Sequence, residues 1–352
     1  MTAVVVRDSC GQQKTSAPID NCPANFYVEN EECLHCEMLG MSCRYTFNKT
    51  NKKEYMKKSK HILLALLLVI GSSAFSQKVP QKSFLLCGDT KVLLVDYMGS
   101  KDTIPKIIWE WDSRNAQDID ESDRKKFRSI DDCKAVNKGE RILVSSSSGA
   151  VAVIERKSKK VLFYTSVPNA HSVELLPDGL LAAAASTNKD GNKILLFKIN
   201  NPGETLFSDS LHSAHGLVWD NKRQSLFALG YDVLREYKLI KKGNPKLLLK
   251  SEWKLPHDGG HDLQMAPDND KLFVTIERSG AWEFNLNSRV FGKIKGFPDS
   301  KIIKSIGQNN AGQYIFTIPE ESWWTFHVKF FNPDRSFSFP GLRVYKARWF
   351  SR

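Results

Sequence analysis

Three histidines recur at nearly equal intervals along the chain and could do chemistry together. His171, His215 and His261 are separated by 44 and 46 residues. Imidazole nitrogens bind divalent metals and act as general acids and bases. Three converging imidazoles could therefore hold one metal ion and leave coordination positions open for a substrate. Histidines this far apart can meet only if a repeated structural unit places them side by side.

The histidines open a phrase that recurs through the second part of the chain. Its five copies, 40–46 residues apart, start at Asp131, His171, His215, His261 and Lys304. Most copies continue with alternating apolar residues, a Pro, Asp, Asn or Gly turn and a second apolar run, which is typical of a β-hairpin. Two further strand-like runs follow, for example 233–239 and 246–253. Four strands in about 40–45 residues indicate a β-propeller blade.

The number of blades follows from the length of the repeating part. Residues 77–352 have room for about six blades, and five starts are visible. Three apolar runs before the first phrase, at 83–87, 91–96 and 106–111, are typical of outer strands, and the run 342–349 can supply the missing innermost strand. Such a composite blade closes the ring without exposed edges. We therefore expect an all-β fold, a six-bladed propeller with four-stranded antiparallel blades.

This fold predicts a polar site at the propeller axis, because the first strand of every blade lines the central channel. The candidate ligand-binding residues on these strands are Asp131, Asp132, Lys134 and Lys304. The candidate catalytic residues are His171, His215, His261 and Glu174, and the same three histidines are the candidate metal ligands. Three interpretations of the histidines stay open: one bound divalent metal ion, a metal-free site for a polar ligand, or hydrogen bonds that only join neighbouring blades.

A tryptophan pair provides a second candidate contact. Trp323 and Trp324 should lie on the loop between the second and third strands of the last blade, which faces the channel opening. Exposed tryptophan stacks on sugar rings, so the pair could form a carbohydrate platform. The alternative is ordinary packing between blades.

The segment before the propeller carries an export signal at 56–76. Lysines precede the nine-residue apolar run 62–70, which is too short to span a bilayer, and Ala74 and Ser76 provide the small residues required for cleavage. We therefore expect a periplasmic or secreted protein with no membrane span in the mature chain, 77–352. Residues 1–55 are expected to be an upstream extension that is not translated or is disordered. The alternative is a zinc module around Cys33-x-x-Cys36.

Net charge and composition narrow the possible partners. The formal net charge is +12, but the basic residues are scattered along the chain, and 41% hydrophobic residues are enough for a large core. Dispersed charge and the predicted export both argue against nucleic acid, and a small anionic ligand is the remaining use of the positive charge. The sequence does not predict an oligomeric state.

Several of these phrases together resemble a family of uncharacterised secreted propellers of Bacteroidetes. They are DDCK (131–134), AHSVELLPDG (170–179), AHGLVWD (214–220), GHDL (260–263), KSI (304–306) and SWWT (322–325). That family is a domain of unknown function, so the resemblance implies export and fold and supplies no reaction. More distantly, the phrase 171–179 is similar to one in arylsulfotransferase propellers. The axial histidines are similar in arrangement to those of metal-dependent oligogalacturonate lyase propellers.

Two functions are consistent with this pattern. The first is an exported protein whose axial site binds a small polar or carbohydrate ligand, preferentially anionic, with the histidines holding a metal or acting as acid and base. Lys134 and Lys304 would then neutralise a carboxylate or sulfate. The second is a non-catalytic binding or protein-interaction scaffold that uses the same face.

Overall fold

The computed structural model describes residues 79–350 and the backbone of five short strands nearer the N-terminus. Those strands are β1 (Val6–Arg7), β2 (Gln13–Lys14), β3 (Asn25–Val28), β4 (Cys33–Met38) and β5 (Met41–Thr46). The chain divides into two compact units, Met1–Ser76 and Gln77–Arg352. The start of the mature chain at residue 77 stays a prediction. The predicted signal peptide at 56–76 lies outside the described residues.

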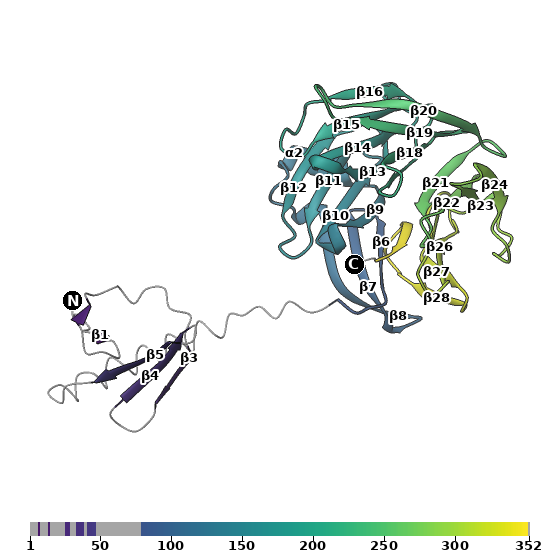
Figure 1. The fold of residues 1–352 in the computed structure, drawn as a ribbon. Helices are drawn as coiled ribbons and strands as arrows, with labels where there is room; N and C mark the ends of the chain where they lie inside the picture. Colours follow the sequence, from purple (N-terminus) through teal and green to yellow (C-terminus); the bar gives the residue numbers. More distant parts are fainter. Residues whose placement is uncertain are drawn as a thin grey trace. The chain divides into compact units, whose positions relative to one another are not determined.

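The second unit is a six-bladed β-propeller of four-stranded antiparallel sheets, as the repeat predicts (Figure 1). Blade 2 contains β9 (Ile130–Val136), β10 (Arg141–Ser146), β11 (Ala150–Glu155) and β12 (Val161–Ser166). Blade 3 contains β13 (Ala170–Leu176), β14 (Leu180–Ala185), β15 (Lys193–Lys198) and β16 (Phe207–Ser210). Blade 4 contains β17 (Gly216–Asp220), β18 (Ser225–Leu229), β19 (Val233–Ile240) and β20 (Lys246–Lys254). Blade 5 contains β21 (Gly260–Met265), β22 (Lys271–Ile276), β23 (Gly280–Asn285) and β24 (Val290–Lys293). Blade 6 contains β25 (Ser305–Gln308), β26 (Tyr314–Thr317), β27 (His327–Phe331) and β28 (Arg335–Ser338).

Blade 1 combines both ends of the propeller, which confirms the predicted closure. Its outer strands are β6 (Ser83–Gly88), β7 (Lys91–Lys101) and β8 (Ile104–Asp112), and its innermost strand is the C-terminal β29 (Val344–Trp349). Figure 1 shows the yellow C-terminal strand lying against the blue β6. The first and last strands of the propeller hydrogen-bond to each other. The closing blade therefore has four strands, the same number as each of the other five blades.

The core consists of one hydrophobic cluster between each pair of adjacent blades. Side chains of a strand alternate between its two faces, so each sheet packs apolar residues against both neighbours. Between blades 6 and 1, the ring of Phe84 stacks on Phe337 at 5.6 Å and meets Phe330 edge-on at 5.2 Å. Between blades 1 and 2 lie Cys87 and Cys133, which are buried free thiols. The hydrophobic core therefore extends around the whole propeller.

Helical structure in the described chain is short and confined to connections. It comprises η2 (Ser113–Asn115), α2 (Glu121–Arg124), η3 (Lys125–Phe127), η4 (Asn137–Gly139) and η5 (Pro177–Gly179). The turns η4 and η5 join the first two strands of blades 2 and 3 and correspond to the turns expected from the repeated phrase. In the part of the chain that the structure describes, no helix has the length and apolar character needed to cross a membrane.

Candidate functional site

Six residues at equivalent positions surround the propeller axis, and we call them the axial ring. They are Asp131, His171, His215, His261, Lys304 and Tyr345. In four blades a β-bulge lies at this position, so that the extra residue is left out of the ladder. In the other two, the backbone N–H groups of His215 and Lys304 bond to carbonyls at 2.9 Å just before their strands begin. In all six blades, the ring residue therefore lies outside the regular β-ladder of its inner strand.

The three histidines predicted from their spacing lie in a row within this ring. The ring centroids of His171 and His215 are 4.2 Å apart, and those of His215 and His261 are 4.9 Å apart. On the other side, the Nε2 atom of His261 is 2.7 Å from the hydroxyl of Tyr345. The imidazoles thus form a continuous polar surface that ends on a phenol.

Backbone contacts orient two of these imidazoles. The Nδ1 atom of His171 lies 3.1 Å from the carbonyl oxygen of Asn169, and that of His215 lies 2.9 Å from the carbonyl oxygen of Ser213. A carbonyl can only accept, so each Nδ1 carries the proton and donates it. The Nε2 atoms of His171 and His215 are then hydrogen-bond acceptors.

Burial keeps the histidines neutral. It lowers the pKa of His171 to about 4, and the positive charges of Lys346 and Lys304 act in the same direction. Burial and the neighbouring imidazoles hold the pKa values of His215 and His261 well below the ordinary range, and the same lysines lower both further. The imidazoles are uncharged and two lysines supply positive charge nearby. The site therefore favours a negatively charged ligand over a cation.

Asp131 lies on blade 2, next to the blade that carries His171, and the pKa of its carboxyl is near neutral pH. Burial raises the pKa of its carboxyl to about 7, although the Ser147 N–H donates to Oδ2 at 2.6 Å and stabilises the ionised form. Near pH 7 this carboxyl is therefore divided between its neutral and charged forms.

Lys304 carries the least compensated charge of the ring. Only 7% of the residue is exposed, yet its ammonium group forms no hydrogen bond or ion pair with any described residue. Burial lowers its pKa, while the charge of Glu277 raises it. A nearly buried ammonium without a partner is costly, so it can gain free energy from an anion that enters the ring.

A second set of charges fills the channel directly beside the ring, and we call it the axial plug. It contains three carboxylates and three cations: Asp132, Lys134, Glu174, Asp262, Lys346 and Arg348. These residues lie one or three positions after the ring residue on their strands, so they occupy the same face of the inner strands.

Every member of the axial plug has an opposite charge within reach. Arg348 bonds to Asp132 and to Asp262, each at 2.7 Å, and Lys346 reaches Asp262 at 3.0 Å. Lys134 bonds to Glu174 at 3.0 Å. Burial alone would raise the pKa values of Asp132 and Asp262, but the adjacent cations dominate and hold both below the ordinary range. The plug is thus an internally neutralised network.

The predicted tryptophan pair divides between two environments. Trp323 is 39% exposed and its ring lies 5.7 Å from the ring of Tyr345, so it borders the axial ring. Trp324 packs edge-on against Phe326 at 4.9 Å. Both lie between β26 and β27, as the sequence predicts, and Trp323 is the member placed to contact a ligand.

The described residues contain no group of three or more His, Cys, Asp or Glu side chains with the geometry of a metal site. The three histidines nevertheless lie close together, with the accepting nitrogens of His171 and His215 oriented by backbone carbonyls as in many metal sites. Binding of a divalent metal by these histidines stays a prediction.

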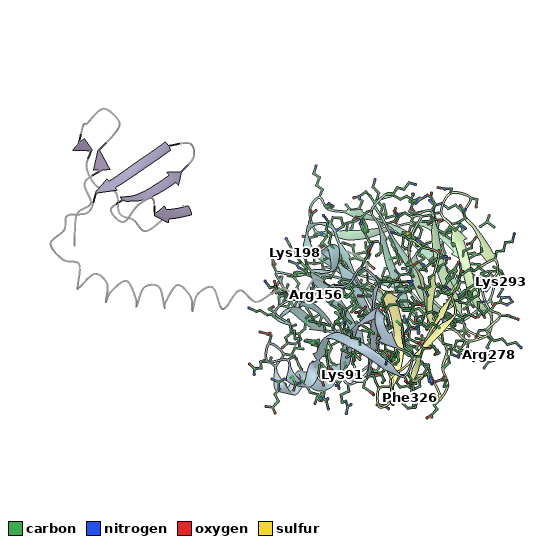
Figure 2. All side chains as sticks on the ribbon, turned by 90° about the horizontal axis from the view of Figure 1, so that it is seen from below. Lys91, Arg156, Lys198, Arg278, Lys293 and Phe326 are labelled. Carbon is green, nitrogen blue, oxygen red and sulfur yellow. The ribbon has the colours of Figure 1, made fainter. Side chains whose placement is uncertain are left out.

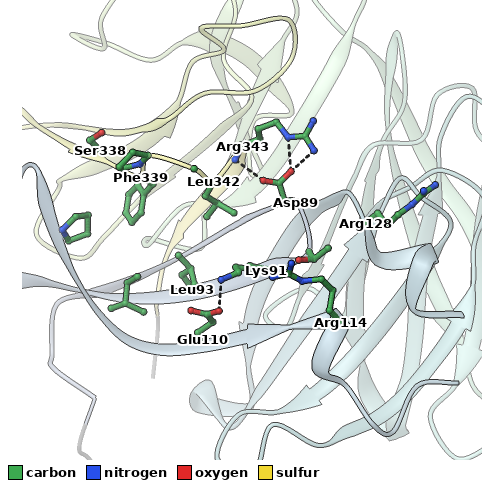
Figure 3. A pocket seen from close by; sticks show the side chains of 15 residues that line it. Asp89, Lys91, Leu93, Glu110, Arg114, Arg128, Ser338, Phe339, Leu342 and Arg343 are labelled. Carbon is green, nitrogen blue, oxygen red and sulfur yellow. Dashed lines mark hydrogen bonds and ion pairs between the residues drawn. The ribbon is translucent and has the colours of Figure 1, made fainter. Parts of the chain in front are cut away.

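A cavity of about 540 Å³ lies away from the ring, at the junction of blades 1 and 6 (Figure 3). On its wall Lys91 pairs with Glu110 at 2.7 Å and Arg343 with Asp89 at 2.6 Å. No residue of the axial ring lines it. Elsewhere, the basic side chains of Lys198 and Lys293 point outward on different sides of the propeller (Figure 2).

Sequence reasoning identified five of the six ring residues and missed the contribution of the last strand. Tyr345 completes the ring, and Lys346 and Arg348 supply two of the three cations of the plug. The sequence nevertheless contains a pattern from which Lys346 and Arg348 could have been predicted as residues of an inner strand. The polar–apolar–polar pattern 346–348 repeats the one at 132–134, 172–174 and 262–264.

Comparison with known proteins gives a family and no activity. A family model described as a family of unknown function, DUF6528, matches residues 71–351. No curated protein matches the chain.

Proposed function

Since the chain belongs to the family of unknown function DUF6528, we propose its function from the site: the axial ring binds a small carbohydrate that carries a carboxylate or sulfate. The supporting observation is Lys304, whose ammonium group is nearly buried and has no partner among the described residues. Each cation of the neighbouring plug is paired with a carboxylate. A ligand anion is the natural partner for the one ring cation that the protein leaves unpaired.

The remaining ring groups match a hydroxylated ligand. The Nε2 atoms of His171 and His215 can accept hydrogen bonds from sugar hydroxyls because their Nδ1 protons are donated to backbone carbonyls. Trp323 offers an exposed aromatic face beside Tyr345, on which a sugar ring can stack. A sugar acid combines the negative charge, the hydroxyls and the flat apolar face that these groups recognise.

Metal binding and catalysis extend the same proposal. The accepting nitrogens of the histidines could hold a divalent metal instead of sugar hydroxyls, although the field of Lys304 and Lys346 opposes a cation. The contact between His261 and Tyr345 offers a proton-transfer pair if the bound sugar is also a substrate.

Export to the periplasm or beyond, proposed from residues 56–76, would expose the site to environmental glycans. An origin in Bacteroidetes stays a prediction.

Calorimetric titration of the full-length protein with glucuronate, galacturonate, glucose 6-sulfate and neutral glucose tests the proposal. We expect at least one anionic sugar to bind and glucose not to bind. Replacing Lys304 by Met should weaken the anion at least about tenfold, because a charge-assisted hydrogen bond is lost. His215→Ala should abolish binding while the protein stays folded. Lys238→Met is the matched control, since Lys238 is exposed on β19 and forms no ion pair with any described residue.

Two results would count against the proposal. The first is equal binding of anionic and neutral sugars, or of none of them. The second is unchanged affinity in Lys304→Met. A stoichiometric divalent metal in the wild-type protein that disappears in His215→Ala would instead support the metal site, and mass analysis of the bound sugar after incubation separates an enzyme from a binding protein.

A further inference from the structure

A second cavity opens on the same face of the propeller as the axial ring, between blades 4 and 5. It has a volume of about 340 Å³, and we call it the outer cleft. Its lining residues are Tyr231, His257, Asp258, Gly259, Glu277, Arg278 and Ser279. These residues come from the β18–β19 turn, the loop into β21 and the β22–β23 turn. All three connections lie at the end of the blades where His215 and His261 are placed.

Bare backbone forms the floor of the outer cleft. Gly259 has φ +94°, a conformation that favours glycine, and a Cβ at this position would lie 2.9 Å from the Cβ of Glu277. The N–H groups of Gly259 and Gly260 both donate to the carbonyl oxygen of Tyr231, at 2.7 and 2.8 Å. These bonds fix the β18–β19 turn against the strand that begins at Gly260, so the cleft has a defined floor.

The outer cleft lies near the axial ring, although no ring residue lines it. Its floor residue Gly259 stands two positions before His261 in the chain. Glu277, on the cleft wall, is close enough for its charge to raise the pKa values of both Lys304 and Tyr345. The two sites are therefore near enough for the proposal that one extended ligand contacts both.

The chemistry of the outer cleft differs from that of the ring. Tyr231 is 40% exposed and its ring lies 5.2 Å from that of His212, so an aromatic face borders the opening. The carboxylates of Asp258 and Glu277 have no hydrogen-bond or ion-pair partner among the described residues. Carboxylates accept hydrogen bonds from sugar hydroxyls and repel a second anion. The guanidinium of Arg278 also lines the cleft, but the two carboxylates outnumber this one cation, so the cleft suits a neutral sugar better than a second anion.

We propose that the outer cleft is a second sugar subsite, and that the ligand is a chain of at least two units with the acidic unit in the axial ring and a neutral unit in the cleft. The inference rests on the proposed function, because it requires an acidic sugar in the ring. A cavity of about 340 Å³ is at the lower end of the range for ligand pockets and accommodates one unit.

Titration of the full-length protein with three probes tests this subsite. The probes are glucuronate, an aldobiouronic acid in which glucuronate is linked to a neutral sugar, and digalacturonate, which has two carboxylates. We expect the aldobiouronic acid to bind at least about tenfold more tightly than glucuronate, because the added unit gains contacts in the cleft. The second unit of digalacturonate should add less affinity than that of the aldobiouronic acid, because its carboxylate would lie near Asp258 and Glu277.

Substitutions in the outer cleft then show which residues provide the gain in affinity. Tyr231→Ala should weaken the aldobiouronic acid by about three- to tenfold through loss of the aromatic contact and leave glucuronate unchanged. Glu277→Gln should reduce the preference for the aldobiouronic acid over digalacturonate. Leu249→Ala is the matched control, since Leu249 is 45% exposed on the outer strand β20, away from the cleft.

The outcomes distinguish this inference from the proposed function. If glucuronate and the aldobiouronic acid bind equally, and Lys304→Met weakens both, the ring binds an acidic sugar and the outer cleft is not a subsite. If Tyr231→Ala weakens both probes alike, the subsite is also wrong. If neither probe binds to the wild-type protein, the proposed function itself fails.

Discussion

The axial ring takes one residue from each of the six blades and the axial plug takes six residues from four inner strands, yet their charges are arranged in opposite ways. In the plug, Arg348 and Lys346 neutralise Asp132 and Asp262 within 3.0 Å. In the ring, Lys304 has no partner among the described residues, and Asp131 keeps a pKa of about 7. Two adjacent layers of one channel therefore differ in how their charges are paired. The difference shows that polar residues of the inner strands can form a fully paired network in one layer while a buried cation in the next layer stays without a partner among the described residues.

The largest effect should come from breaking the plug. Arg348→Met removes the guanidinium that pairs with both Asp132 and Asp262, so it leaves buried carboxylates poorly compensated. We expect the free energy of unfolding to fall by about 3–5 kcal/mol, measured by urea denaturation. Arg343→Met, which removes an exposed pair with Asp89, should cost less than about 1 kcal/mol. Equal losses in the two variants would mean that the plug contributes no more than a surface pair.

An intermediate effect should appear in the pH dependence of ligand binding. Below about pH 7 the carboxyl of Asp131 is protonated and neutral, and above it the carboxylate repels an anion in the ring. Uronate affinity should therefore fall by about three- to tenfold between pH 6 and pH 8. Calorimetry at both pH values measures this change. Asp131→Asn should remove the dependence, and a variant that keeps it would assign the titration to another group.

The smallest effect concerns the stability of the ring. Burial lowers the pKa of Lys304, so at neutral pH its charged form is less favourable in the folded protein than in the unfolded chain. Lys304→Met should therefore leave the free energy of unfolding unchanged or raise it by up to about 1 kcal/mol, in the opposite direction to Arg348→Met. Urea denaturation of both variants under one condition makes the comparison. A loss of stability in Lys304→Met would show that the ring cation supports the fold.

The fold could be predicted from the sequence because its information is local and repeated. Five phrases with hairpin character, from Asp131 to Lys304, gave the blade and its period. The apolar run that ends at Trp349 could be assigned to the closing blade because three outer strands lacked an inner partner. Strand ends were less certain, as in β7, which continues to Lys101.

The separation of ring from plug could not be predicted in the same way. Asp131 and Asp132 are adjacent in sequence and identical in type, yet one accepts a backbone N–H and the other pairs with Arg348. That difference depends on which strand of another blade lies opposite, more than 200 residues away along the chain. Tyr345 was missed for a related reason, since its strand lacks the hairpin turn that marks the other phrases.

The position of β29 also sets the order in which the protein can become functional during biosynthesis. The strand that supplies Tyr345, Lys346 and Arg348 follows every other strand of the propeller in the chain, so it is the last of them to be synthesised. Until β29 pairs with β6, Asp132 and Asp262 lack their strongest partners and Lys304 has no phenol beside it in the ring. Any ligand that needs the complete ring can therefore bind only after β29 has closed the propeller, which ties maturation of the site to closure of the last blade.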